Sequence, residues 1–322
     1  MDRQLLDQLK ARWSVLQYLE RRDWKPCRRS GRGEIGGLCP LHAETQPSFW
    51  VHPGKQVFYC HGCGRGGDVI RLVELLDQVS FPQAVARLRA LEGRAALVAD
   101  AAAFYRRQLQ PHREAIDYLH GRGLYAAAVI AALGIGYAPG GCLRAHLSQR
   151  GYGAAQMREA GLIDARGRDA FYRRVVFCWG SQIYGRSLDE QAGLRHRFLR
   201  GSKGGLYQWE HCQHHRAVIL VEGLFDVAAL WQAGFPSATC SFGTHLNQTQ
   251  WEQLASGRRT VLIAFDGDEA GQRAAAELAA RLSQRGQTYR RLHWPAGHDA
   301  ASYFAAGALA ADFQGLLEAA QP

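Results

Sequence analysis

Short apolar runs and amphipathic stretches alternate along this chain. Two of the runs, at residues 218–221 and 261–265, are uninterrupted and contain β-branched residues. Runs of this kind are typical of parallel strands that are covered on both faces. A stretch with helical spacing follows each run, so the pattern predicts an open α/β sheet in the second half of the chain.

The N-terminal part of the chain predicts a smaller and different unit. Apolar residues recur at helical spacing over residues 2–22, which predicts one amphipathic helix. Glycine and proline residues follow, which are typical of turns between short elements. We expect three short strands and two helices there, at residues 34–39, 48–52, 56–60, 68–77 and 81–91. The alanine-rich stretch that follows is expected to be a helical connector.

Together these patterns predict a multidomain chain of mixed α+β and α/β class. In the middle of the chain, apolar strand pieces are interleaved with cations, which suggests a basic α+β subdomain. The predicted segments are an N-terminal unit at 1–93, a helical connector at 94–111, the basic subdomain at 112–214, the parallel-sheet α/β domain at 215–305 and a short helix or tail at 306–322.

Charge narrows the class of partner. The chain carries 39 Lys and Arg against 29 Asp and Glu, a formal net charge of +10, and such an excess favours a polyanionic partner. No apolar run approaches the roughly 20 residues that span a bilayer, and the N-terminus lacks the apolar region of a secretory signal. We therefore expect a cytoplasmic protein without membrane association, in which the eight cysteines do not form a disulfide framework.

Acidic residues follow both apolar runs of the predicted parallel sheet. Glu222 comes directly after the first run, and Asp266 and Asp268 come directly after the second. Ligands of open α/β sheets bind beyond the carboxyl ends of the strands, and clustered carboxylates repel one another unless a cation neutralises them. Oxygen ligands favour Mg²⁺ or a similar hard ion. The alternative is that these acids only cap the helices that follow.

The N-terminal unit contains two pairs of metal-ligand residues. Cys39 and His42 form one pair, and Cys60 and Cys63 form the other. Two such pairs on facing turns supply the four ligands of a structural Zn²⁺ ion, and metal binding can supply the folding free energy of so small a unit. The alternative is four ordinary residues that happen to fall in this spacing.

Two sets of motifs resemble those of DnaG-type bacterial primases. The series Val221-Glu-Gly-x-x-Asp-Val, Ser241-Phe-Gly-Thr and Phe265-Asp-Gly-Asp-Glu-Ala-Gly resembles the Toprim domain of that family. Cys39-Pro-Leu-His-x-Glu-x-x-Pro-Ser-Phe, followed by Phe58-Tyr-Cys-His-Gly-Cys-Gly-x-Gly-Gly-Asp, is similar to its zinc ribbon. The resemblance covers nearly the whole chain. It implies template-directed synthesis of short RNA primers on single-stranded DNA from nucleoside triphosphates.

The resemblance also implies roles for individual residues. Glu222, Asp266 and Asp268 would be the catalytic acids that bind Mg²⁺ or Mn²⁺, and Asp299 would be either a further ligand or a helix cap. The residues expected to contact nucleotide or template phosphates, unless they form a solvated basic face, are Arg174, Arg186, Arg197 and Lys203. The chain departs from the family at Phe171-Tyr-Arg-Arg174, where the usual Phe-Arg-x-Arg loses its first arginine.

On this interpretation the chain is a short form without the family's C-terminal helicase-binding domain, as expected of a phage, plasmid or mobile element. A helicase or replication protein of that element is then the expected partner, and stimulation by a host helicase is not expected. Two alternatives stay open. One is a Toprim nuclease, which would degrade DNA without nucleotides, and the other is a zinc-dependent DNA-binding accessory protein without turnover.

Overall fold

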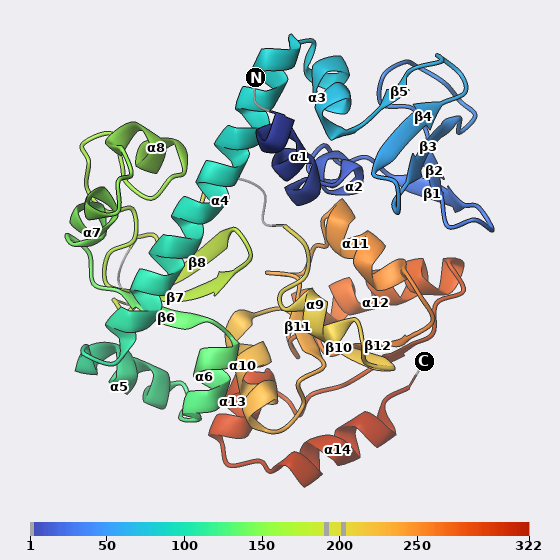
Figure 1. Ribbon diagram of the computed structural model, residues 1–322. Coiled ribbons are helices and arrows are strands. Elements are labelled where there is room, and N and C mark those ends of the chain that lie inside the picture. The colour runs from blue at the N-terminus through green and yellow to red at the C-terminus, as the bar shows by residue number, and fades with distance from the viewer. Residues whose placement is uncertain (1–2, 190–192, 201–203, 322) are drawn as a thin grey trace. The chain divides into compact units, whose positions relative to one another are not determined.

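The computed structural model describes residues 3–189, 193–200 and 204–321 (Figure 1). The chain divides into two compact units, residues 1–95 and 96–322. The division falls within helix α4, Phe81–Leu109. The predicted helix at 81–91 and the predicted helical connector are therefore one continuous helix.

The first unit is built on an antiparallel sheet of five short strands in the order β1-β2-β3-β4-β5. The strands are Pro26–Arg29, Ile35–Gly37, Phe49–His52, Val57–Cys60 and Gly66–Gly67. Phe49 stacks on Phe58 at 5.2 Å, and the edge of Trp24 meets Phe49 at 5.5 Å, so aromatic rings form the centre of a small core. Helix α3, Val69–Asp77, begins at the N-cap residue Asp68.

The single helix predicted over residues 2–22 is wrong. The structure has two helices there, α1 at Arg3–Arg12 and α2 at Val15–Glu20. The Ser14 hydroxyl accepts the Gln17 N–H at 3.0 Å, and the Gln17 side chain accepts the Ser14 N–H at 3.0 Å. This capping box starts a new helix at Val15 although the apolar spacing continues through it.

The second unit contains an antiparallel sheet in the order β6-β7-β8-β9, with β9 at one edge. The strands are Ile135–Ala138, Arg174–Trp179, Gln182–Ser187 and His196–Phe198. Helices of this region are α5 at Arg113–Gly121, α6 at Ala127–Ala132, α7 at Leu143–Gln149, α8 at Ala154–Glu159 and α9 at Trp209–Cys212. Neighbouring residues of β7 enter different cores, because side chains alternate across a strand: Val175 packs in one cluster and Val176 in another.

A parallel sheet in the order β11-β10-β12-β13 follows, and every pairing in it is parallel. Its strands are Ala238–Cys240, Ala217–Val221, Thr260–Ile263 and Tyr289–Arg291. Leu220 and Ile263 pack against helices α11, Gln248–Ala255, and α12, Glu269–Gln284. Ile219 and Val221 face the opposite side of the sheet. The prediction of a parallel α/β sheet is confirmed.

Helices α10, α13 and α14 contribute to the core on that opposite side. They span Leu224–Gln232, Ala300–Ala305 and Ala310–Ala319. Phe313 of α14 is fully buried and stacks on Trp294 at 5.5 Å. The last described helix is thus part of the second unit's core. None of the helices described here has the length and apolar character needed to cross a membrane.

Candidate functional site

Four metal-ligand side chains meet in the first unit. One ligand atom from each of Cys39, His42, Cys60 and Cys63 lies within 4.8 Å of the others. Cys60 ends strand β4, and Cys63 lies in the turn that follows. Both buried thiols accept a backbone N–H group. The Leu41 N–H lies 3.4 Å from the Cys39 sulfur, and the Cys63 N–H lies 3.4 Å from the Cys60 sulfur. Three thiolates and an imidazole so close together suit a tetrahedral Zn²⁺ ion.

The Glu44 carboxylate contacts residues of this cluster and orients them. Its Oε2 lies 3.2 Å from Nε2 of His42, and its Oε1 accepts the Cys39 N–H at 2.7 Å and the Ser48 N–H at 3.1 Å. The Ser48 hydroxyl, above all, holds the pKa of Glu44 below its usual value. His42 therefore has Nε2 engaged by a carboxylate and Nδ1 left for the ion, 3.9 Å from the Cys60 sulfur.

A second cluster forms at the carboxyl ends of the parallel strands. Asp266 comes after β12, Asp226 lies in the first turn of α10, and Asp299 is the N-cap of α13. One carboxylate oxygen from each of these three residues lies within 4.8 Å of the others. Asp226 is buried, and its Oδ1 accepts the Ala301 N–H at 3.0 Å. The set consists of oxygen ligands only, which fits a hard divalent cation.

The electrostatics of this cluster favour a bound cation. Burial, and then the charge of Asp299, raise the pKa of Asp226 to about 8. Burial and the charges of Glu222, Asp299 and Asp268 raise the pKa of Asp266 to about 7. Burial also raises the pKa of Glu222. In each case burial and the neighbouring negative charges disfavour the ionised form, which a bound cation would favour.

Two of the predicted acids have other contacts. The Glu222 side chain accepts the Asp266 N–H at 3.0 Å, so it fixes the chain just after β12. Asp268 is exposed and accepts the Gly271 N–H at 2.7 Å as the N-cap of α12. Neither belongs to the three-carboxylate cluster, although both charges act on Asp266. Their roles as metal ligands stay predictions.

Asp226 was missed as a site residue by the sequence analysis. Its place four residues after Glu222, at one helical turn into α10, was the pattern that could have indicated it. Asp299 caps a helix, as one of its two expected roles requires, and its role as a metal ligand stays a prediction. Its side chain accepts the Ser302 N–H at 2.7 Å, which caps α13, and it also lies in the carboxylate cluster.

Gly271 lets α12 begin directly against the acidic site. A Cβ atom at this position would overlap the Asp266 carbonyl oxygen and lie 2.7 Å from Oε1 of Glu222. Real Cβ atoms essentially never approach other atoms so closely, and both neighbours are fixed, one as backbone and the other by its hydrogen bond to Asp266. Only glycine fits this close approach.

A cavity of about 340 Å³ adjoins the acids. Glu222, Asp226 and Asp266 line one side of it, and the other side is formed by Tyr184, His196, Phe198 and Phe242. Phe242 has a left-handed backbone, with φ of 61°, and stacks on Trp179 at 5.0 Å. The acids therefore face a largely aromatic wall, which lowers the local dielectric and strengthens their interaction with a cation.

The predicted phosphate-binding residues are placed very differently from one another. Arg174 is 8% exposed, and its guanidinium donates to the carbonyls of Gly185, Leu194 and Arg195 at 3.3, 2.6 and 2.9 Å. These bonds tie β7 to the segment before β9 and use three of the five N–H donors of the guanidinium. Arg186 contacts His196, and Arg197 lies over the Phe171 ring at 5.9 Å. Lys203 lies outside the described residues.

Family models match three consecutive segments of the chain. A CHC2 zinc finger matches residues 1–101, the N-terminal domain of the DNA primase catalytic core matches residues 104–183, and a Toprim-like domain matches residues 219–304. The DNA primase of Pseudomonas putida is 33% identical over 309 residues, which cover 81% of this chain and 47% of that protein. This chain thus spans about half the length of that relative.

Solved structures agree with these matches. A crystal structure of the zinc-binding and RNA polymerase domains of the Aquifex aeolicus primase is 26% identical, with a TM-score of 0.66, and the match covers 99% of this chain and 86% of that one. A structure of the DnaG primase catalytic domain bound to single-stranded DNA is also 26% identical, with a TM-score of 0.61 over 73% of this chain and 80% of that one. The chain therefore belongs to the DnaG-type primase family, of which it contains the zinc ribbon, the N-terminal domain of the catalytic core and the Toprim domain.

Proposed function

We propose that this protein synthesises short RNA primers on a single-stranded DNA template from nucleoside triphosphates. The observation that carries the proposal is the cluster of Asp226, Asp266 and Asp299 at the carboxyl ends of the Toprim strands. Three oxygen ligands beside an open cavity suit Mg²⁺ or Mn²⁺ together with phosphate oxygens of a substrate. The structure of a related catalytic domain bound to single-stranded DNA supports the template class.

The chain's own residues would divide the work as follows. Asp226, Asp266 and Asp299 supply the negative charge that holds a divalent cation, and Glu222 fixes Asp266 through its backbone N–H. A cation held there would stabilise negative charge on the triphosphate and help lower the pKa of the attacking 3′-hydroxyl. The aromatic wall at Phe198 and Phe242 would lower the local dielectric in the same cavity and so strengthen the attraction between the acids and the cation.

The zinc ribbon would have a structural role. Cys39, His42, Cys60 and Cys63 would hold one Zn²⁺ ion and leave no position for a reacting water, because four protein ligands close a tetrahedral site. On this view the ion fixes the turns at the ends of β2 and β4, and the ribbon contributes to binding of the template. The protein would then act with the replication machinery in the cytoplasm.

A priming assay tests the proposal. The protein is incubated with single-stranded DNA of mixed sequence, labelled nucleoside triphosphates and Mg²⁺ or Mn²⁺. We expect short labelled RNA from the wild-type protein and none from Asp266→Asn. Glu269→Gln is the matched control, because Glu269 lies on the same segment but is exposed and paired with Arg273. It should leave the yield unchanged.

The same assay separates the alternatives. Degradation of DNA without nucleotides, lost in Asp266→Asn, would replace the proposal by a nuclease. DNA binding by a protein that gives no RNA and no cleavage under any of these conditions would leave the accessory protein. Equal RNA yield from Asp266→Asn and the wild type would show that the Toprim carboxylates are not the catalytic site.

A further inference from the structure

Two histidines at the end of helix α9 lie outside both the zinc ribbon and the Toprim acids. Helix α9 packs against strand β11 in the second unit (Figure 1). His211 lies in the last turn of the helix, and His215 follows four residues later. Nε2 of His211 lies 3.5 Å from Nε2 of His215, and the ring centroids are 5.3 Å apart. Two ring nitrogens that face each other can share a proton or hold a metal ion between them.

The distance between the two nitrogens fits a metal ion better than a shared proton. Zn²⁺ binds imidazole nitrogen at about 2.0–2.1 Å in a tetrahedral arrangement, so two nitrogens on one ion are about 3.4 Å apart. The 3.5 Å between the two Nε2 atoms is close to this value. Hydrogen bonds from N–H groups are typically about 2.7–3.2 Å long, so the same distance is long for a direct bond between the rings.

The fold holds the two rings near each other. His211 packs against Trp231 of α10, with ring centroids 5.0 Å apart, and the Trp231 indole N–H donates to the Ala238 carbonyl at 3.0 Å. The His215 backbone N–H donates to the Cys212 carbonyl at 3.1 Å, which keeps the chain wound after the helix ends. Side chains that are already in place lose less conformational entropy when an ion binds.

The neighbouring residues of this run do not join the pair. Cys212 is fully buried, and its thiol donates to the Ala238 carbonyl at 3.3 Å, so it points into the core. Among the described residues, His214 does not complete a three-ligand group with the two histidines. Glu210 and Arg216 are both exposed and flank the run with opposite charges, which offset each other. Two imidazole nitrogens are therefore the ligands that this segment offers.

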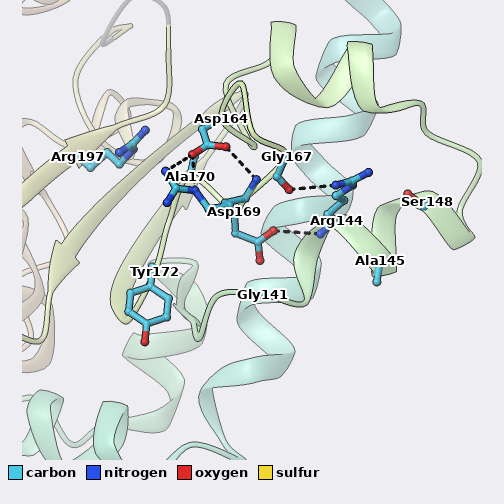
Figure 2. Close-up of a pocket in the computed structure, with 11 residues that line it drawn as sticks. Gly141, Arg144, Ala145, Ser148, Asp164, Gly167, Asp169, Ala170, Tyr172 and Arg197 are labelled. Atoms are coloured by element: carbon cyan, nitrogen blue, oxygen red, sulfur yellow. Dashed lines mark hydrogen bonds and ion pairs between the residues drawn. The ribbon is translucent and has the colours of Figure 1, made fainter.

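Acids in another part of the second unit do not compete with this pair. In the cavity beside α7, Asp164 pairs with the Arg168 guanidinium at 2.8 Å (Figure 2). Asp169 in the same cavity accepts backbone N–H groups at the start of α7 at 3.0 to 3.2 Å. These donors already offset the two negative charges. A cation that prefers nitrogen ligands is thus directed to the histidines.

We propose that His211 and His215 bind a divalent transition-metal ion, for which Zn²⁺ fits the distance best. Imidazole nitrogen suits Zn²⁺, Cu²⁺ and Ni²⁺, whereas carboxylates and water suit Mg²⁺, so this site and the Toprim acids select different ions. Water would take the remaining positions of the ion. Two protein ligands hold an ion more weakly than the four of the zinc ribbon, so the ion should leave on dialysis while the zinc of the ribbon stays.

An ion at this site would clamp elements that carry the Toprim acids. His215 lies two residues before β10, the strand that leads to Glu222. His211 rests on Trp231 of α10, and the first turn of that helix contains Asp226. An ion that binds the folded pair more tightly than the unfolded chain stabilises the fold by mass action. The concentration of free Zn²⁺ would thus regulate the stability of the second unit.

Isothermal titration calorimetry tests the ligands. The dialysed full-length protein, which keeps the zinc of the ribbon, is titrated with Zn²⁺ in excess Mg²⁺, which occupies the acidic site. We expect one further Zn²⁺ per chain. Loss of a residue that only orients a ligand lowers metal affinity about 10- to 100-fold, so His211→Ala and His215→Ala should each weaken this binding at least about 10-fold. His293→Ala is the matched control, because His293 is an exposed histidine of the same unit outside the pair. His214→Ala should also bind like the wild type.

Thermal unfolding and hydrogen exchange test the clamp. Added Zn²⁺ should raise the Tm of the dialysed wild type and increase the protection of residues 209–221. The same increase is expected for His293→Ala and not for His211→Ala or His215→Ala. A measurement without any variant comes from crystals soaked in Zn²⁺, which should give an anomalous peak between the two Nε2 atoms.

Either of two results would overturn the site. A wild-type protein that binds no second Zn²⁺ would show that the histidines only contact each other. Equal binding by the wild type, His211→Ala and His215→Ala, or an anomalous peak only elsewhere, would place the ion on other residues. Neither result depends on primer synthesis, so this site and the proposed function are tested separately.

Discussion

The two candidate metal sites are assembled in different ways. The zinc-ribbon site is formed by two neighbouring turns of one small sheet, which carry Cys39, His42, Cys60 and Cys63. The carboxylate site is formed by three separate elements of the second unit, which carry Asp226, Asp266 and Asp299. The zinc-ribbon ligands are residue types that are rarely paired in this spacing for any other reason. The Toprim carboxylates are common residue types at strand ends, where many acids cap helices instead. The zinc-ribbon ligands lie in two closely spaced pairs along the chain, which made that site easy to predict. The carboxylates lie far apart along the chain, so the sequence did not determine which acids form the second site.

The two sites also differ in what holds them without an ion. Around the thiols, backbone N–H groups and Glu44 already fix the ligands. Around the carboxylates, burial raises the pKa values of Asp226 and Asp266 to about 8 and about 7. Protons therefore compete with the cation for the second site at neutral pH. The first site should bind its ion for structural stability and the second in exchange with the solution.

The largest expected effect follows from removing the ion of the first site. Cys60→Ser with Cys63→Ser should abolish zinc binding and unfold residues 1–95, because structural zinc contributes on the order of 10 kcal/mol to so small a unit. Hydrogen exchange should show loss of protection in β3 and β4 and wild-type protection in β10 and β12. Cys27→Ser is the control, since Cys27 is exposed and outside the cluster. Zinc content at the wild-type level in the double variant would disprove this assignment.

The second prediction separates the carboxylate cluster from the acid that caps a helix. Asp226→Asn should reduce RNA synthesis by about 100-fold or more, as expected when a group that stabilises charge at the reacting centre is lost. Asp268→Ala should retain more activity and mainly lower the free energy of unfolding, by about 1 kcal/mol for the lost N-cap of α12. The initial rate of primer synthesis and urea unfolding measure the two effects. The reverse order of activities would restore Asp268 as the ligand.

A smaller effect is expected for the residue that orients His42. Glu44→Gln leaves all four zinc ligands in place but weakens the contact to Nε2 of His42. Loss of such a contact typically lowers metal affinity 10- to 100-fold. Competition with a coloured chelator measures the change. Glu34→Gln, in the same unit but outside the cluster, should bind zinc like the wild type.

The fourth prediction concerns pH, with the second site free of metal. Because the pKa of Asp226 is about 8 in the folded protein and about 3.9 in an unfolded chain, the folded protein binds more protons between these values. The contribution of this titration to the free energy of unfolding is then fully present at low pH and is lost as the pH rises toward 8. The Tm of the metal-free protein should fall between pH 5.5 and 8.5, less so in Asp226→Asn, while Glu277→Gln should follow the wild type. Mn²⁺ should raise the Tm more at the higher pH. A Tm independent of pH in the wild type would contradict the assignment.

The sequence predicted helices and strands correctly where the local pattern of apolar residues agreed with the tertiary structure. Strand β10 differs by one residue from the predicted strand, and helix α12 follows the second apolar run where helical spacing was predicted. Strand β11 was missed because three residues give no periodicity. Arg174 was expected to contact phosphate, but its carbonyl partners come from Gly185 and the segment before β9, which no spacing along β7 could reveal. Contacts between distant segments were the part that the sequence did not determine.

Gly271 sets a limit on how this protein can be improved. Glycine in a helix normally costs about 1 kcal/mol relative to alanine, so a search for thermostable variants would try Gly271→Ala early. Here the added methyl group would displace the Asp266 backbone or the Glu222 side chain. The clash would cost more than the helix propensity of alanine gains, so this substitution should lower stability and disturb the acids together. Directed evolution for a more robust protein would have to find its gains elsewhere, while selection for the proposed activity should keep this glycine.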